Sequence, residues 1–269
     1  MRTDLDDHRK ALARMLDKAR RVVVFTGAGV SAESGIPTFR GSGGLWEKYP
    51  PSLFGNIPGL AVSFLFLPGR FRRFIGEALE TFLAAEPGPA HLWLAKKEAE
   101  GRLQGVITQN IDGLHQKAGS RTVVELHGAL KRFRCRGCGA RFEVPDEILE
   151  ALATRISKGR GLWGRTWKTL KEEAPRCPEC GKLSRPDVVF FGEGLPRDEW
   201  ARAQELAANC DLMLVLGTSG VVYPAAHLPL TAKSAGAVLV EINPEPGSFA
   251  DICQLCIAST VGEFFGGMP

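Results

Sequence analysis

The sequence contains no uninterrupted apolar run that would cross a bilayer. Its longest apolar stretch, residues 52–66, is broken by Gly55, Pro58 and Gly59, whereas a spanning helix needs about 20 consecutive apolar residues. A strong charge bias is also missing, since 34 basic and 30 acidic residues leave a net charge of +4. We therefore expect no membrane contact, and the charge alone gives no reason to expect a polyanionic partner.

The N-terminus lacks the apolar segment of a secretory signal, because residues 1–7 are rich in aspartate. We therefore expect a cytoplasmic protein with reduced thiols. Internal repeats and low-complexity segments are absent as well. The 269 residues, 44% hydrophobic and 24% charged, are typical of a globular protein with one large α/β domain and something smaller.

The most informative stretch is a β-branched apolar run, residues 22–25, that ends in Thr26-Gly27-Ala28-Gly29. Gly27-x-Gly29-x-x-Ala32 fits the dinucleotide fingerprint, in which small residues bring a pyrophosphate onto a helix N-terminus. The acidic partner expected about 20 positions later is missing, because Glu47 does not end a strand-like run. We therefore expect a phosphate cradle in which an adenosine ribose is held differently. A purely structural turn is the alternative.

Further apolar runs are predicted as strands at residues 105–108, 122–126, 188–191, 212–216 and 237–242. They are apolar on both faces, which is typical of a parallel sheet covered by helices. Helices are predicted at residues 4–20, 89–100, 112–118, 196–209 and 224–235. This pattern predicts a Rossmann-like, doubly wound α/β sheet.

Polar residues and glycines follow each predicted strand, in segments 27–29, 109–112, 127–128, 192–193, 217–219 and 243–245. Ligands of open parallel sheets bind at the carboxyl ends of the strands, so we expect these segments on one rim. Residues 1–40, 87–130 and 186–269 would form this discontinuous domain. A helical insertion, residues 41–86, and a cysteine-bearing insertion, residues 131–185, would form a smaller domain above the rim.

Two C-x-x-C pairs, Cys135/Cys138 and Cys177/Cys180, offer the four thiolates of a tetrahedral structural zinc. Such a site has no open position for substrate, so we expect the zinc to hold a fold. Unligated core cysteines are the alternative. Cys253 and Cys256 have the spacing of half such a site but lack a second half. We expect them to be a buried strand pair, and redox activity is the alternative.

The 38 residues between the cysteine pairs include a basic segment, residues 155–171, with Trp163 and Trp167. We interpret this segment as a solvated basic helix, although contact with an acidic partner or nucleic acid is the alternative. His127 follows a predicted strand on the rim, where a neutral imidazole can accept a proton from a hydroxyl group. Asn110 and Asp112 bring an amide and a carboxylate to the same rim, and Asp112 also suits a helix cap.

With these motifs in order, the chain resembles a sirtuin of the prokaryotic type, the family of NAD-dependent protein deacylases. The matching segments are 27–31, 35–40, 108–112, 126–128, both cysteine pairs, 189–193, 217–219 and 241–243. The resemblance implies that NAD is consumed while acyl-lysine becomes free lysine, with nicotinamide and O-acyl-ADP-ribose as products. The leading function is NAD-dependent lysine deacetylation, and nucleic acid is not required. We also expect a monomer.

The resemblance also assigns roles to residues. Asn110, a candidate catalytic residue, would contact nicotinamide with Ile111 and Asp112, and His127 would be the general base. The other NAD contacts would be Gly27, Ala28, Ala32, Phe39, Arg40, Gln109, Gly217, Thr218, Ser219, Asn243 and Val261. The acyl-lysine substrate would pair with Val189, Phe190, Phe191, Gly192 and Glu193.

Departures from the family pattern qualify this interpretation. The only tyrosines, Tyr49 and Tyr223, do not supply the Tyr-x-x-Arg of sirtuins that remove acidic acyl groups. The end of the chain, residues 262–269, does not predict the usual closing helix. The apolar residues 53–66 raise a long-chain deacylase as an alternative, and mono-ADP-ribosyl transfer is another. A zinc-ribbon protein that binds nucleic acid is the alternative outside enzymes.

Overall fold

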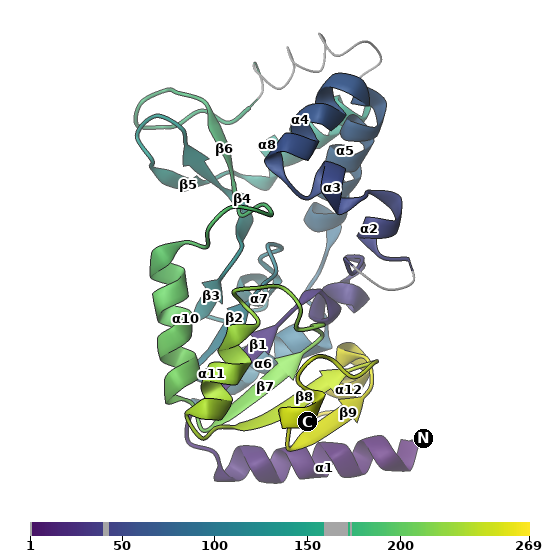
Figure 1. Ribbon diagram of the computed structural model, residues 1–269, viewed down its shortest axis with the longest axis vertical. Helices are drawn as coiled ribbons and strands as arrows, with labels where there is room; N and C mark the ends of the chain where they lie inside the picture. Colours follow the sequence, from purple (N-terminus) through teal and green to yellow (C-terminus); the bar gives the residue numbers. More distant parts are fainter. Residues whose placement is uncertain (1, 40–42, 159–171, 173) are drawn as a thin grey trace.

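The computed structural model describes residues 2–39, 43–158, 172 and 174–269. They form a larger part built on a six-stranded sheet and a smaller part that stands above it (Figure 1). Arg40 and most of the basic segment 155–171 lie outside the described residues. Within the described ranges, no helix has both the length and the apolar character that crossing a membrane requires.

The six-stranded sheet has β1 (Val22–Thr26) near its centre and the strand order β3-β2-β1-β7-β8-β9. Its other members are β2 (Gly105–Thr108), β3 (Val123–Glu125), β7 (Leu212–Leu216), β8 (Val238–Asn243) and β9 (Leu255–Ala258). All neighbouring strands pair in parallel. The chain winds outward from β1 in both directions, which confirms the doubly wound, Rossmann-like fold. The strand order reverses between β1 and β7, and open sheets of this kind bind ligands at the carboxyl ends of the strands at that point.

Helices cover both faces of this sheet, which is why all five residues of β1 are buried. On one face, α1 (Arg2–Lys18), α6 (Pro89–Ala99) and α12 (Val261–Gly266) pack Leu12, Leu94 and Phe264 against the strands. On the other face, α10 (Arg197–Asn209) and α11 (His227–Ser234) form a second apolar layer. The short α7 (Leu114–Lys117) follows β2.

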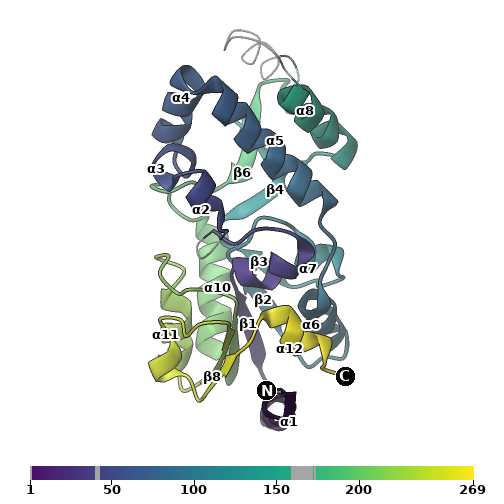
Figure 2. The same cartoon turned by 90° about the vertical axis from the view of Figure 1, so that its right-hand side faces the viewer.

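The smaller part combines helices with a three-stranded antiparallel sheet of order β5-β4-β6. The strands are β4 (Gly128–Cys135), β5 (Arg141–Glu143) and β6 (Ser184–Val188). The helices are α2 (Leu45–Lys48), α3 (Pro51–Phe54), α4 (Ile57–Phe66), α5 (Pro68–Ala84) and α8 (Asp146–Lys158). In both ribbon views this part stands above the sheet, with α5 beside α8 (Figures 1 and 2). The proposed division into domains stays a prediction.

One predicted strand of the parallel sheet is wrong. The run 188–191 does not join that sheet: Val188 ends β6 in the antiparallel sheet, and residues 189–191 follow it as a loop. The sixth parallel strand is β9, which was not among the strands predicted for this sheet, although Cys256 was expected in a strand. Its residues alternate in burial because β9 lies at the sheet edge, so it lacks the continuous apolar run by which the other strands were found.

Two predictions near the chain end are also corrected. Cys253 and Cys256 are not a buried strand pair, since Cys253 is half-buried outside β9 and Cys256 is exposed within it. A closing helix is present as α12. Its N-cap is Thr260, whose side-chain oxygen accepts a hydrogen bond from Glu263 N at 3.2 Å. The apolar stretch 53–66 is divided between α3 and α4, and Ile57, Val62, Leu65 and Phe66 are exposed.

Candidate functional site

The glycine-rich loop after β1 packs against the loop after β7. Gly29 N donates to Gly217 O at 2.9 Å, and a Cβ on Gly217 would lie 2.6 Å from the carbonyl carbon of Gly29. Gly217 also has φ +58°, in the left-handed region that favours glycine. Ala28 and Ala32 follow in η1 (Ala28–Ser34), a 3₁₀-helix rather than the α-helix that the fingerprint predicts. The glycines therefore bring two strand ends into direct contact at the switch point of the sheet.

A buried polar network lies behind this loop. Asn110 Nδ2 donates to Gly27 O and to Ser31 Oγ, both at 3.1 Å. Ser31 Oγ in turn donates to Asp112 Oδ2 at 2.7 Å, and Leu114 N donates to Asp112 Oδ1 at 2.9 Å. Asp112 thus accepts from the first backbone N–H of α7, although the N-cap itself is Gly113, and the carboxyl oxygens of Asp112 keep lone pairs for a further donor. The network holds the amide and the carboxylate close together at the carboxyl ends of β1 and β2.

A second cluster of polar residues lies at the ends of β2, β7 and β8. Gln109 Nε2 donates to Thr218 Oγ1 at 3.0 Å, and Asn243 Nδ2 donates to Thr218 O at 3.4 Å. Ser219 is exposed beside them, and its carbonyl accepts from Ser248 Oγ at 2.9 Å. These residues come from three strand ends and meet at one rim, as the sequence predicts.

His127 connects this rim to the smaller part, because β4 begins directly after it. Its Nδ1 lies 2.9 Å from Gln109 O. A carbonyl oxygen only accepts, so Nδ1 carries the proton and Nε2 keeps its lone pair. Burial lowers the pKa of His127, partly opposed by the hydrogen bond to Gln109. The ring is therefore neutral at pH 7 and able to accept a proton at Nε2.

The loop 189–193 is built between His127 and α3. Val189 N donates to His127 O and Phe191 N donates to Gly55 O, both at 2.9 Å. Glu193 holds the loop closed: its carboxylate accepts from Phe190 N at 3.0 Å and from both terminal nitrogens of Arg185 at 2.7 and 2.8 Å. The Arg185 hydrogen bond, with the smaller contribution of Phe190 N, lowers the pKa of Glu193 to about 2.

A row of three aromatic rings, Phe39, Trp46 and Phe191, connects the segment after η1 with this loop. The Phe39 and Trp46 ring centroids lie 5.2 Å apart, and those of Trp46 and Phe191 lie 6.1 Å apart. Phe39 and Phe191 are exposed, so the row is open to a ligand. Val261 differs from the other predicted contacts because its side chain packs in the core. With 1% of the residue exposed, Val261 offers little surface to a ligand in this structure.

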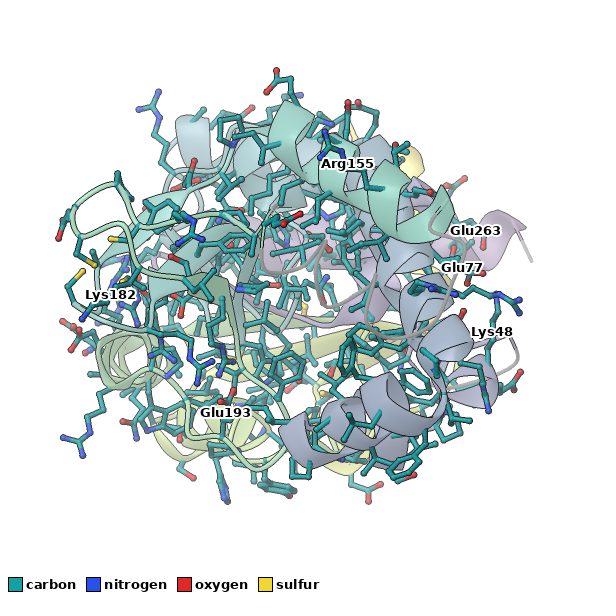
Figure 3. The ribbon with its side chains drawn as sticks, turned by 90° about the horizontal axis from the view of Figure 1, so that it is seen from above. Lys48, Glu77, Arg155, Lys182, Glu193 and Glu263 are labelled. Atoms are coloured by element: carbon teal, nitrogen blue, oxygen red, sulfur yellow. The ribbon has the colours of Figure 1, made fainter. Side chains whose placement is uncertain are left out.

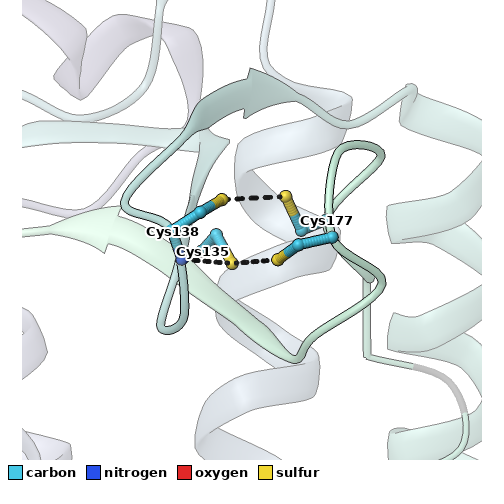
Figure 4. A group of neighbouring side chains, drawn as sticks. Cys135, Cys138 and Cys177 are labelled. Atoms are coloured by element: carbon cyan, nitrogen blue, oxygen red, sulfur yellow. Dashed lines mark hydrogen bonds between the residues drawn. The ribbon is translucent and has the colours of Figure 1, made fainter.

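The four predicted metal ligands are brought together in the smaller part (Figure 4). Their sulfur atoms lie within 4.8 Å of one another, with Cys135 and Cys180 at 3.4 Å and Cys138 and Cys177 at 3.6 Å. Hydrogen bonds from the backbone, that of Cys138 first, lower the pKa of Cys135 to about 6. Four convergent sulfur donors fit a tetrahedral zinc ion that holds the β4–β5 turn against residues 177–180.

Several residues that shape the site were not among the predicted site residues. Ser31 links Asn110 to Asp112, and Arg185 holds Glu193. His91 and His115 are fully buried with ring centroids 4.7 Å apart, and burial lowers the pKa of His91 to about 4. Ser31 lies inside the quoted motif 27–31, so that motif was a signal for it. Arg185 lies 8 residues before Glu193, and the two histidines come from different helices, so no local pattern pointed to them.

Comparison with known proteins agrees with this architecture. Residues 27–224 match the model of the Sir2 family. The chain is 47% identical over 252 residues to NAD-dependent protein deacylase 2 of Pyrobaculum aerophilum, a match that covers 94% of this chain and 91% of that one. It is 43% identical to an NAD-dependent protein deacylase of Pyrococcus furiosus over 94% of this chain and 93% of that one.

Solved structures show the same likeness. A structure described as Sir2-p53 peptide-NAD+ matches with a TM-score of 0.76 and 37% identity, over 96% of this chain and 95% of that one. A structure of Sir2Tm bound to a propionylated peptide matches with a TM-score of 0.75 and 37% identity over the same shares. The fold, the order of the motifs and these matches together show that the chain belongs to the Sir2 family, the sirtuins.

Proposed function

We propose that this protein is an NAD-dependent protein lysine deacetylase that converts acetyl-lysine, NAD and water into lysine, nicotinamide and O-acetyl-ADP-ribose. One observation carries the proposal: His127 lies between the two groups of residues that the reaction needs. Its ring is held by the Gln109 carbonyl on the rim, and its own carbonyl accepts from Val189 of the loop 189–193. The relatives named above are NAD-dependent protein deacylases, which supports the assignment.

The rim residues suit the cofactor end of this reaction. When bound, NAD supplies an electrophilic ribose carbon and nicotinamide as the leaving group. Asn110, Ile111 and Asp112 would bind the nicotinamide end, and the buried Asp112 carboxylate offers an acceptor for a carboxamide N–H. Gln109, Thr218, Ser219 and Asn243 would hold the ribose and phosphate groups, with Gly27, Ala28, Ala32, Gly217 and the Val261 backbone beside them. Phe39 would shield the ribose face and Arg40 would contact a phosphate.

The loop 189–193 suits an extended peptide. Val189, Phe190, Phe191 and Glu193 already donate their backbone N–H groups within the chain, so a peptide would pair with the loop mainly through its own N–H groups and the loop carbonyls. Phe191, in the aromatic row with Trp46 and Phe39, would guide the acyl-lysine side chain toward the rim. His127 Nε2 would then take the proton of a ribose hydroxyl.

The test is mass spectrometry of an acetyl-lysine peptide incubated with the protein, with and without NAD. We expect loss of the acetyl group only with NAD, formation of O-acetyl-ADP-ribose, and a rate at least 100-fold lower for His127→Ala. His227→Ala is the matched control, because His227 is an exposed histidine at the start of α11 to which no role in the site is assigned. Equal rates for His127→Ala and wild type would contradict the role of His127.

The same experiment separates the other activities. Turnover of a myristoyl-lysine peptide would indicate a long-chain deacylase. The exposed apolar residues of α4 are the observation that favours this alternative. ADP-ribose attached to protein would indicate mono-ADP-ribosyl transfer. If folded, zinc-loaded protein deacylates none of several peptides but binds DNA tightly, the result would favour the hypothesis of a nucleic-acid-binding protein over that of a deacetylase. We further propose that the protein acts as a monomer in the cytoplasm, which gel filtration and fractionation test.

A further inference from the structure

A second group of metal-binding side chains lies in the larger part, far along the chain from the four cysteines. It consists of Glu241 on β8, Cys253 after η2 (Ala250–Ile252) and Cys256 on β9. One carboxylate oxygen and the two sulfur atoms all lie within 4.8 Å of one another. Glu241 and Cys256 are direct partners in the parallel β8–β9 register, so the pairing of the strands itself places their side chains on the same face of the sheet.

Glu241 is the member of this group whose side chain lacks a full set of partners. Its side chain is buried, with 2% of the residue exposed. Oε2 accepts a long hydrogen bond from Gly247 N at 3.3 Å, whereas Oε1 is buried without a hydrogen-bond partner among the described residues. A buried carboxylate oxygen without a partner destabilises the folded state, because the cost of removing it from water is not offset by any contact. A cation bound at Oε1 would remove that cost.

We propose that Glu241, Cys253 and Cys256 form a second metal site, which binds a thiophilic divalent cation of the zinc class. Two thiolates and one carboxylate are typical zinc donors, and water would complete a tetrahedron. Two sulfur atoms about 2.3 Å from one ion lie about 3.8 Å apart at a tetrahedral angle, so the observed group needs only a small contraction. The exposed Cys256 gives the ion a path from solvent.

A disulfide between Cys253 and Cys256 is the main alternative use of these thiols. It would leave Glu241 Oε1 buried beside neutral sulfur and still without a partner, whereas a cation is paired with all three side chains. The carboxylate therefore favours a metal over a disulfide. Gly247 also fits this geometry, because a Cβ there would collide with Glu241 Oε1.

The site lies directly behind part of the rim. Gly247 N contacts Glu241, and the next residue, Ser248, donates to Ser219 O from both its backbone nitrogen and its hydroxyl, at 3.3 and 2.9 Å. Glu241 and Cys253 bracket residues 242–252, which include Asn243. A bound cation would fix both ends of this segment. The binding of the cation does not depend on the proposed catalytic function.

The test is the zinc content of the full-length protein, saturated with zinc under a non-chelating reductant and passed through gel filtration. We expect the wild type to carry one more zinc ion per chain than Cys253→Ser/Cys256→Ser. Cys210→Ser is the matched control, because Cys210 is a buried cysteine outside both groups, and it should keep the wild-type content. Glu241→Gln keeps the shape but removes the charge, and it should weaken the second ion at least tenfold in a chelator competition.

Cobalt provides a readout that does not rely on the serine variants. A cobalt titration of the wild type should show a second sulfur-to-metal absorption step, and Glu241→Gln should shift that step to higher cobalt concentration. Equal zinc content in wild type and Cys253→Ser/Cys256→Ser would overturn the proposal. So would a Cys253–Cys256 disulfide, found by mass spectrometry, that persists in reductant.

Discussion

The two parts of this molecule are stabilised in different ways. In the larger part, apolar layers cover both faces of the six-stranded sheet, and residues of β1 and β7 are buried without exception. In the smaller part, the apolar cluster under the three-stranded sheet contains Phe133, Val144 and Leu149 as its buried members. Four cysteines and a group of arginine–carboxylate ion pairs accompany it.

This difference follows from the amount of apolar surface that each part buries. A parallel sheet with helices on both sides forms a thick core, whereas a small antiparallel sheet needs additional links to hold one structure. In a reduced protein a metal provides that link, because its binding energy becomes folding energy. The smaller part also carries Gly55 and the loop 189–193, so its stability decides whether the candidate peptide site exists.

Removing the metal ligands should therefore have the largest effect. We expect Cys135→Ser/Cys138→Ser to lose the zinc of this site, whose binding contributes about 10–16 kcal/mol in small zinc domains. Residues 131–185 should become sensitive to protease and deacylation should be lost. Cooperative unfolding of the parallel sheet should remain. Metal analysis and limited proteolysis followed by mass spectrometry test this expectation.

A core substitution is the matched control for that experiment. Phe25 is fully buried in β1, so Phe25→Ala should lower the free energy of unfolding by about 3–5 kcal/mol while the zinc content of the folded protein stays unchanged. If the cysteine variant kept the protease resistance of wild type, the smaller part would not depend on its metal. The contrast between the two parts would then be wrong.

The next effect concerns Arg132, which joins the two parts. Its guanidinium lies 2.8 Å from Glu125 at the end of β3 and 3.2 Å from Asp187 on β6. Arg141 and Arg134 also face Asp187, so Glu125 depends more strongly on Arg132. We expect Arg132→Met to lower the free energy of unfolding by about 3–5 kcal/mol near pH 8, because it leaves the buried Glu125 carboxylate without its cation. Urea unfolding measures this.

The stability that Arg132→Met loses should become smaller as the pH falls. Burial raises the pKa of Glu125, with Arg132 opposing the shift. The Glu125 carboxyl therefore stays protonated to a higher pH in the folded state than in the unfolded state, where its pKa is about 4.3. The stability that this proton contributes is present at low pH and is lost as the pH rises. Without Arg132 the folded pKa rises further, so Arg132→Met should be closer to wild type at pH 5. Glu125→Gln/Arg132→Met should recover most of the loss at pH 8.

The parts of the fold that could be predicted from the sequence are those governed by local pattern. Residues 105–108 and 212–216 form β2 and β7 as predicted, because a strand buried on both faces needs a continuous apolar run. The run 188–191 has the same composition but follows an antiparallel strand. Its backbone binds His127 and Gly55 rather than a parallel neighbour, and the Phe191 ring packs against Trp46. Pattern alone does not distinguish the two cases.

The candidate site shows the same limit of local pattern. Gln109, Asn110, Asp112 and His127 follow strands, so the sheet itself brings them to one rim. Ser31 gains its place through a hydrogen bond to Asp112, 81 residues later in the chain, and Arg185 through the turn that brings Glu193 back to β6. The proposed second metal site was only half visible: the C-x-x-C spacing marks Cys253 and Cys256, whereas Glu241 joins Cys256 through the β8–β9 register. Strand pairing, rather than spacing, completes that site.

The smallest effect is expected where charges are exposed. Lys48 Nζ and Glu77 Oε2 lie 2.6 Å apart between α2 and α5, with 56% and 41% of their side chains exposed, at the outer edge of the smaller part (Figure 3). Water screens such a pair, and ordering two long side chains opposes it. Glu77 also accepts from the Tyr49 hydroxyl at 2.8 Å, so its carboxylate keeps a partner when Lys48 is replaced. We expect Lys48→Met to leave the thermal midpoint nearly unchanged at physiological salt, and differential scanning calorimetry tests this. A drop comparable to that of Arg132→Met would mean that the smaller part depends on its surface charges as strongly as on its buried ones.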